Sequence, residues 1–306
     1  MKLPNRYWLM GAALFGGISV NVAQAQTDYG EGDTIGAANN LSAEGVQAAS
    51  KLVKTGKTYS LGIVTGPDTP AWGTRWYKMG IFDLGPYGNN KLTGHDDLLM
   101  TYLGIGSQID GLGHIGVDGV FYGGHTSADI KTQAGLTKLG TENIPPIVTR
   151  GVLLDMAKHF GQSVLKEGTV FNNKEIKAAA EAQGIVIKRG DVVLFHTGWL
   201  SIMEDDPERF KTVGPGLGVE GAQYLADLGV VAVGADSPSV EVVPAENGSM
   251  AFPVHAVLIP KNGVYILENM NTGPLAADDA HEFMFVLGQP KFEGSVQAVI
   301  NPIAIR

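Results

Sequence analysis

The chain has 306 residues and a formal net charge of −9, which argues against non-specific binding to nucleic acid or to an anionic membrane surface. It contains no cysteine, so disulfide bonds, thiolate zinc sites and cysteine nucleophiles are all excluded. The length is ample for one large hydrophobic core.

The first 25 residues have the three parts of a secretory signal. Lys2 and Arg6 form a positively charged start, residues 7–20 are uncharged and mostly apolar, and Ala23 and Ala25 give the small-x-small pattern that signal peptidase cleaves. The apolar stretch is shorter than the ~20 residues of a membrane-spanning helix. We therefore expect cleavage after Ala25, a periplasmic or secreted protein, and no membrane attachment of the mature chain.

Residues 26–41 are rich in Gly, Asn and Asp and are expected to form a flexible leader, so the folded domain is predicted to span residues 42–306. Helices are predicted over residues 42–55, 172–183 and 219–228, because apolar residues recur at helical spacing and each segment ends at a glycine. Asn172 and Glu175 also form a capping-box pattern.

Short β-like runs lie between these helices. They are predicted at residues 59–64, 76–84, 98–105, 152–154, 191–196, 230–234, 264–268, 283–287 and 296–305. Several are continuous apolar runs, as in strands buried on both faces. Strands alternate with helices in the second half, which favours parallel pairing through right-handed crossovers. The predicted fold class is therefore α/β, in a single compact domain.

The segment Gly104–His114 holds three polar groups inside a glycine-rich, apolar stretch. Gln108 and Asp110 are two residues apart, so on a strand they face the same way. His114 can fold back toward them if the glycines between make a turn. A carboxylate and an imidazole beside an amide suit a divalent metal. The alternative is a turn capped by Asp110, with His114 as a hydrogen-bonded core residue.

A second polar pair stands downstream. His255 lies in an apolar stretch, and Glu268 ends the apolar strand at residues 264–267. A carboxylate at the end of a buried strand is costly unless it is paired or bound to a metal. Either residue could serve as general acid, general base or ligand. The alternatives are a surface cap for Glu268 and a loop residue for His255.

Four further residues are candidates for binding a substrate. Asp236 follows an apolar strand, which is where α/β folds place their sites, although an Asp before Ser-Pro also forms turns. His196 ends another strand and can reach a pocket. Trp72 and Phe121 could line an aromatic pocket, or could pack in the core.

These segments together resemble the cyclase family of metal-dependent hydrolases, which includes bacterial kynurenine formamidase and isatin hydrolase. Gly104–His114 aligns with the family signature His-x-Gly-Thr-His-x-Asp-x-x-x-His. Further similar segments are residues 118–122, 149–154, 191–199, 234–239 and 255–268, so that the resemblance spans residues 58–270 in the expected order. It implies a compact β/β/α domain with a mixed, barrel-like sheet, peripheral helices and a homo-oligomeric assembly.

Two signature histidines are replaced here, the first by Gly104 and the second by Gln108. In formamidase-like members these histidines help to build a two-zinc site, so the sequence predicts one divalent ion, manganese or zinc. The resemblance implies that Asp110 anchors this ion, with Gln108 and His114 as further ligands. It implies that His255 or His114 moves the proton, and that Glu268 is a ligand or orients His255.

The implied activity is hydrolysis of an amide or cyclic amide in a small compound from the environment. Trp72 and Phe121 are expected to pack against a flat aromatic substrate. A related enzyme that hydrolyses lactones is the first alternative. The second is a periplasmic binding protein that has lost catalysis on the same fold.

Overall fold

The computed structural model describes residues 29–306, so the expected signal over residues 1–25 lies outside the described residues. Within 29–306, no helix is both long and apolar enough to span a bilayer. Residues 29–41, expected to be a flexible leader, lie against the body. Their short helix η1 (Gly36–Asn40) buries Ala37 and Ala38, and Tyr265 donates a hydrogen bond to the carbonyl of Ile35.

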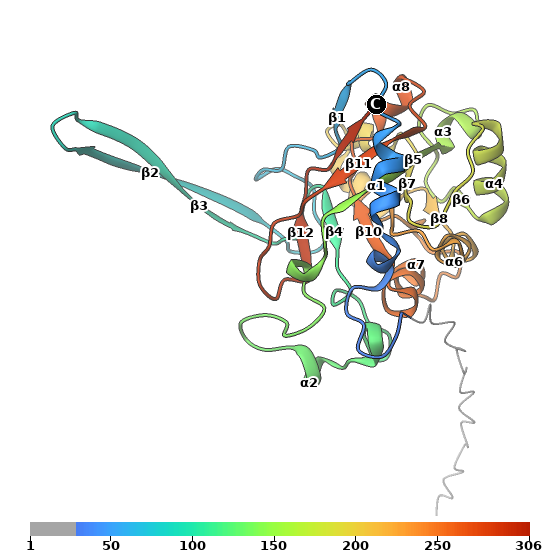
Figure 1. Cartoon of the computed structure of the whole chain (residues 1–306), viewed down its shortest axis with the longest axis horizontal. Coiled ribbons are helices and arrows are strands. Elements are labelled where there is room, and N and C mark those ends of the chain that lie inside the picture. The colour runs from blue at the N-terminus through green and yellow to red at the C-terminus, as the bar shows by residue number, and fades with distance from the viewer. Residues whose placement is uncertain (1–28) are drawn as a thin grey trace, which may run out of the picture.

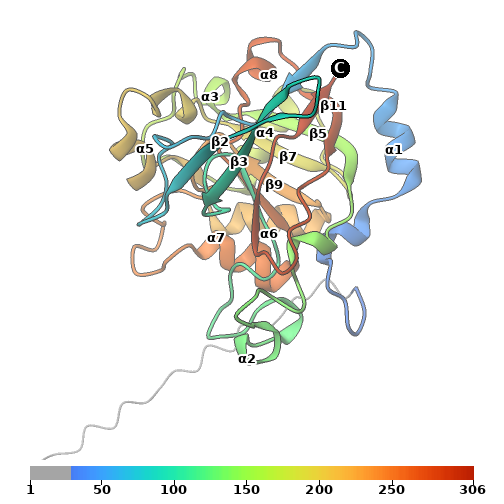
Figure 2. The ribbon, with the colours of Figure 1, turned by 90° about the vertical axis from the view of Figure 1, so that its left-hand side faces the viewer.

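A nine-stranded mixed sheet, curled into a half-barrel, forms the body and confirms the predicted α/β fold class (Figure 2). Its strands run in the order β1-β13-β11-β5-β7-β9-β10-β4-β12. Their bounds are β1 (Thr58–Ser60), β4 (Gln108–Asp110), β5 (Ile147–Asp155), β7 (Val192–His196), β9 (Ala232–Ala235), β10 (Tyr265–Glu268), β11 (Glu282–Leu287), β12 (Gln297–Val299) and β13 (Ile303–Ile305).

The four central strands, β5, β7, β9 and β10, are parallel, and the strands on either side of them pair antiparallel. This agrees with the crossovers predicted for the second half of the chain. β4 pairs antiparallel with β10, which places Gln108 beside Glu268. β12 pairs with the other edge of β4 and places Gln297 beside Asp110. Three strands distant in sequence therefore bring polar residues to one point.

Two of the crossover helices form where the sequence predicts them. α4 (Asn173–Ala182) begins with the capping box of Asn172 and Glu175, and α6 (Val219–Leu228) ends at Gly229, whose φ of 77° is the left-handed conformation that glycine adopts freely. α1 (Ala43–Ser50) is shorter than its predicted range and packs against β5 and β11. Figure 1 shows α4 and α6 together at the end of the molecule opposite the projecting hairpin of β2 (Tyr77–Tyr87) and β3 (Leu92–Thr101).

The remaining elements are short. They are α2 (Ser127–Ile130), α3 (Met156–His159), α5 (Pro207–Thr212), α7 (Pro253–Ala256), α8 (Gly273–Ala277), η2 (Tyr122–Gly124), η3 (Thr141–Asn143), η4 (Trp199–Ile202), the π-helical turn η5 (Val257–Lys261), and the paired strands β6 (Val170–Phe171) and β8 (Gly216–Leu217). α7 and η5 fill the connection between β9 and β10, so α7 lies above the carboxyl ends of the parallel strands.

A long hairpin made of β2 (Tyr77–Tyr87) and β3 (Leu92–Thr101) projects from the body as a separate two-stranded sheet (Figure 1). Strands were predicted at residues 76–84 and 98–105. β3 starts earlier than predicted because residues 92–97 are mostly polar and give no strand signal of their own, whereas backbone pairing with β2 makes them a strand.

Strand β7 runs through the core, and its residues Val192–Phe195 are fully enclosed. The ring of Phe195 lies 4.7 Å from that of Phe171. We expect Phe195→Ala to lower the free energy of unfolding by about 3–5 kcal/mol, because it removes a large buried side chain and leaves a cavity. Val186→Ala is the control, because Val186 is 68% exposed, and it should change the free energy of unfolding by less than about 0.5 kcal/mol. Urea denaturation measures both, and equal losses would contradict this view of the core.

Candidate metal centre

β4 directs two polar side chains to the same buried face, as the two-residue spacing predicts. Gln108 and Asp110 are both enclosed, while Ile109 between them packs in the hydrophobic core. The Gln108 amide nitrogen donates to Glu268 Oε2 at 2.6 Å and, more weakly, to Asp110 Oδ1 at 3.4 Å. Gln297 of β12 donates to the same Asp110 oxygen at 2.7 Å. Two amides therefore hold two buried carboxylates in place.

His255 completes this group from α7. Its Nε2 atom lies 3.2 Å from Glu268 Oε1 and 3.6 Å from Asp110 Oδ2. Its Nδ1 atom lies 2.5 Å from Glu241 Oε1, and the Glu241 carboxylate also accepts the backbone N–H groups of Val254 and His255. Glu241 thus fixes the ring so that Nε2 faces the two carboxylates, the arrangement that orients a metal-binding histidine.

Asp110, His255 and Glu268 form a group able to hold a cation. One ligand atom from each lies within 4.8 Å of the others, and all three residues are buried. Asp110 Oδ2 has no hydrogen-bond partner among the described residues. A buried carboxylate oxygen without a donor is costly, and a divalent ion between these atoms would satisfy it. Two carboxylates and an imidazole suit manganese or zinc.

The remaining predicted ligands stand at the margin of this group. His114 Nε2 is 3.9 Å from Asp110 Oδ2, because the turn at residues 111–114 folds the ring back toward β4. Gln108 presents its amide N–H₂ to the carboxylates, so it acts as a hydrogen-bond donor here. Its oxygen would have to turn inward for it to serve as a ligand.

The buried charges shift one another's ionisation. Burial and the nearby Asp110 carboxylate raise the pKa of Glu268 to about 7, against the opposing effect of His255. Burial by itself lowers the pKa of His255, but Asp110, Glu241 and Glu268 outweigh it and raise that pKa well above its usual value. Burial also lowers the pKa of His114, and there it outweighs the attraction of Asp110. His114 is therefore neutral near pH 7.

A cavity of about 190 Å³ opens onto the group. Its lining consists of Trp72, Arg75, Gln108, Asp110, His114, Ile115, Phe252, His255, Glu268 and Gln297. The rings of Trp72 and Phe252 meet edge to face at 5.6 Å, and Trp72 Nε1 donates to the carbonyl of Pro238. The predicted aromatic residue Trp72 thus lies beside the candidate metal ligands, where a flat ring would fit.

The other predicted substrate residues lie elsewhere. Phe121 lines a neighbouring hollow of about 510 Å³, which it shares with His114. His196 and Asp236 line a separate cavity of about 830 Å³. There the Asp236 carboxylate accepts the backbone N–H groups of Thr197 and Gly198 and the Thr197 hydroxyl, and lies 3.2 Å from His196 Nδ1. These contacts hold the turn after β7 in shape.

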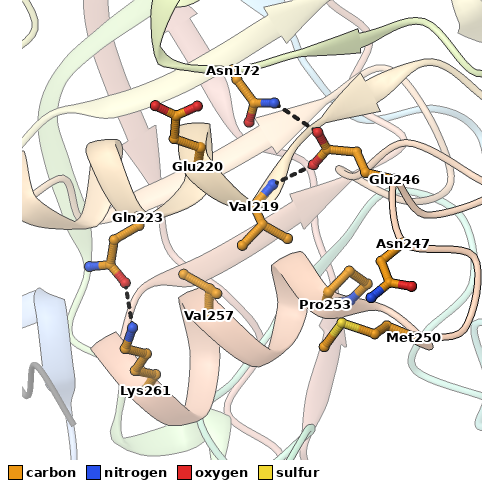
Figure 3. Close-up of a pocket in the computed structure, with 10 residues that line it drawn as sticks. All are labelled: Asn172, Val219, Glu220, Gln223, Glu246, Asn247, Met250, Pro253, Val257 and Lys261. Atoms are coloured by element: carbon orange, nitrogen blue, oxygen red, sulfur yellow. Dashed lines mark hydrogen bonds between the residues drawn. The ribbon is translucent and has the colours of Figure 1, made fainter. Parts of the chain in front are cut away.

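A further hollow of about 610 Å³ lies between α6 and the α7–η5 segment (Figure 3). Its charged side chains make hydrogen bonds to neutral partners. Glu246 accepts hydrogen bonds from Asn172 and from the backbone N–H of Val219, and Lys261 donates to Gln223 (Figure 3). Among the described residues, the group of His, Asp and Glu able to hold a metal lies at the smaller cavity beside Asp110 and not at this hollow.

Sequence reasoning missed several residues at the site, among them Arg75, Glu241, Phe252 and Gln297. Glu241 stands between two valines and Gln297 follows one, so each is a polar residue in an apolar run, the signal that identified Glu268. Gly104, where the family signature has a histidine, makes room for the others. A Cβ atom there would lie 2.4 Å from Gln297 Oε1 and 2.7 Å from Arg75 Nη1.

Comparisons with known proteins identify the family and the fold. The Cyclase family model matches residues 59–242. A crystal structure of a cyclase is 29% identical, with a TM-score of 0.84 over 91% of this chain and 96% of that one. An isatin hydrolase bound to the product analogue thioisatinate is 17% identical, with a TM-score of 0.62 over 86% and 98%.

A structure described as a potential metal-dependent hydrolase with cyclase activity is 18% identical, with a TM-score of 0.53 over 81% of this chain and 98% of that one. Likeness at this level of identity shows the fold. No curated protein matches the chain.

The pKa of Glu268 predicts how the stability of the metal-free protein depends on pH. In the unfolded chain the carboxyl loses its proton near pH 4.5, whereas in the folded protein it keeps it to about pH 7. Raising the pH through this window should therefore lower the free energy of unfolding, by up to about 3 kcal/mol. Glu268→Gln cannot titrate and is the reference. Urea denaturation in a chelator from pH 5 to 8 measures the difference, and a constant difference would contradict the shift.

Proposed function

Because the chain belongs to the Cyclase family, we propose that it is a metal-dependent hydrolase that breaks the C–N bond of an amide or cyclic amide in a small aromatic compound. The observation that carries this is the buried group of Asp110, His255 and Glu268, with an Asp110 oxygen left without a donor. Supporting it, related structures are described as an isatin hydrolase and as a potential metal-dependent hydrolase.

The residues divide the work as follows. Asp110, Glu268 and His255 hold one divalent ion, manganese or zinc, and Glu241 fixes the His255 ring. When bound, such an ion polarises a carbonyl group and makes water easier to deprotonate. Trp72 and Phe252 receive the flat part of the substrate above the ligands. The narrow cavity excludes bulk water around the reacting carbonyl.

His114 is the proton carrier in this proposal. It lines the cavity, lies beside Asp110 and is neutral near pH 7, so it can accept a proton. Hydrolysis adds the oxygen of water to the carbonyl carbon and breaks the C–N bond. His114 takes a proton from the water and passes it to the leaving nitrogen. The products are an amine and a carboxylic acid, which ionises to a carboxylate by releasing its proton to solvent; the two groups stay in one molecule when the substrate is a ring.

The metal site can be separated from proton transfer by two variants. We expect Asp110→Ala to lose the ion and to lower kcat/KM more than about 100-fold. His114→Gln should keep the ion and lower kcat by about 100-fold or more. Asp205→Ala removes an exposed carboxylate away from the cavity and is the matched control, with metal content and activity unchanged. Plasma mass spectrometry and a panel of cyclic amides and lactones measure these outcomes.

The panel also decides between the alternatives. Faster turnover of lactones than of matched cyclic amides would assign the enzyme to C–O bonds. Full metal content and activity in Asp110→Ala would contradict the site. Failure of the wild type to bind manganese or zinc would leave a binding protein on a hydrolase fold.

A further inference from the structure

Arg75 brings a positive charge into the cavity that holds the candidate metal ligands. Its Nη1 atom donates to the carbonyl of Gly104 at 2.6 Å, its one hydrogen bond to the described residues. Throughout residues 29–306, no Asp or Glu oxygen lies within 4.0 Å of this guanidinium, whereas Arg150 and Arg209 each pair with carboxylates. Most of the N–H donors of Arg75 are therefore free to meet a ligand.

Gly104 makes room for this placement of Arg75. With a Cβ atom at position 104, the ends of the Arg75 and Gln297 side chains would have to move from where they lie. Gln297 in turn donates to Asp110, so Gly104 admits one residue that holds the metal group and one that faces the cavity. The replaced signature histidine thus leaves room for a cation from the chain itself.

We propose that Arg75 is the anion-binding residue of this site and takes the carboxylate of an aromatic acid. This rests on the proposed function, because amide hydrolysis creates a carboxylate inside the cavity. A guanidinium binds a carboxylate through two parallel N–H···O bonds. Trp72 and Phe252 lie in the same cavity and would contact the ring of the same ligand.

Benzoate and benzamide test this, because they share shape and differ in charge. Binding is measured by calorimetry on metal-free protein, so that no ion attracts the carboxylate. We expect benzoate to bind at least about 10-fold more tightly than benzamide, the range of a charge-assisted hydrogen bond. Arg75→Gln should abolish this preference and Arg75→Lys should keep part of it. Lys54→Gln, which removes an exposed charge elsewhere, should leave it unchanged.

Two results would overturn the proposal: no preference for benzoate in the wild type, or an undiminished preference in Arg75→Gln. Either can occur while the wild-type protein binds metal and hydrolyses amides. The failure of Arg75 as anion site is thus distinguishable from failure of the proposed function.

The β2–β3 hairpin carries a second, independent inference. Eight of its large apolar side chains are 43–63% exposed. They are Met79, Ile81, Phe82, Tyr87, Leu92, Leu98, Leu99 and Met100. Because side chains alternate along a strand, Met79, Ile81 and Leu99 lie on one face and Phe82, Leu98 and Met100 on the other. The hairpin extends away from the body (Figure 1), and among residues 29–306 no segment covers either of its faces.

The β2–β3 hairpin is expected to be stabilised by packing against another surface. A two-stranded hairpin is marginally stable alone in water, and its exposed apolar area, on the order of 800 Å², exceeds what monomers usually expose. Two copies would together bury about 1,600 Å², the size of a standard stable interface. Asp83, Asp96 and Asp97 on the same hairpin would be repelled by an anionic membrane.

We infer that the hairpin is an arm that a second copy of this chain covers on both faces. A two-fold pair satisfies both arms at once, because each arm lies on its partner. Arg75 and Trp72 precede β2 directly, so the base of each arm adjoins the cavity described above.

Sedimentation of the full-length mature protein at about 10 µM tests this, because an interface of standard size holds a stable dimer at that concentration. We expect a dimer for the wild type and a monomer for the double variant Leu98→Asp, Leu99→Asp, which places a charge on each face. Val186→Asp adds a charge to an exposed valine outside the arm and should stay dimeric. Unchanged metal content and circular dichroism show that the body has folded. A monomeric wild type, including one that floats with lipid vesicles, or a dimeric double variant would overturn the inference.

Discussion

The burial of two carboxylates side by side is the constraint on which the rest of the site depends. Asp110 and Glu268 are both excluded from water, and like charges in a low-dielectric interior repel strongly. The chain answers with donors from both sides: amides of Gln108 and Gln297, and the imidazole of His255. These leave Asp110 Oδ2 unsatisfied, and a divalent cation would complete the balance. Stability of the metal-free protein and affinity for a metal are thus two aspects of one arrangement.

The sheet places these groups through a change of strand direction. β10 is the last of the parallel strands, and Glu268 stands at its carboxyl end. β4 and β12 then continue the sheet antiparallel, so that their polar residues come level with Glu268 and Asp110. α7 lies over this junction and places His255 next to Asp110 and Glu268. Glu241 fixes the orientation of the imidazole ring through its contact with Nδ1. Each element contributes one or two side chains, and the rigid strands keep the distances between them.

Gly104, which stands where the family signature has a histidine, lies beside both the metal-binding group and the segment that leads into the projecting hairpin. With no side chain at this position, Gln297 and Arg75 both approach β4. Arg75 lies just before β2, the first strand of the projecting arm. The same short segment therefore supplies a charge to the cavity and begins the surface that we assign to a second copy. A change at position 104 would be felt by Asp110 through Gln297, as well as by Arg75.

Local pattern in the sequence was sufficient to predict the helices at residues 172–183 and 219–228, the parallel strands that alternate with them, and the shared face of Gln108 and Asp110. Helix capping, apolar periodicity and the two-residue repeat of a strand depend on residues that are close in sequence. A single segment therefore holds all the information that such a prediction needs. The meeting of Asp110 with His255 and Glu268 could be suspected only from the family resemblance, because about 150 residues separate β4 from α7 and β10.

Tertiary structure alone decided the roles of Arg75, Glu241 and Gln297 and the exposure of the β2–β3 arm. Residues 79–82 and 98–100 of the arm are apolar, as in a buried strand, and nothing in the local sequence indicates that the body leaves them exposed. Whether a side chain is buried, paired or free depends on which distant segments pack beside it, and that is settled by the folded sheet as a whole.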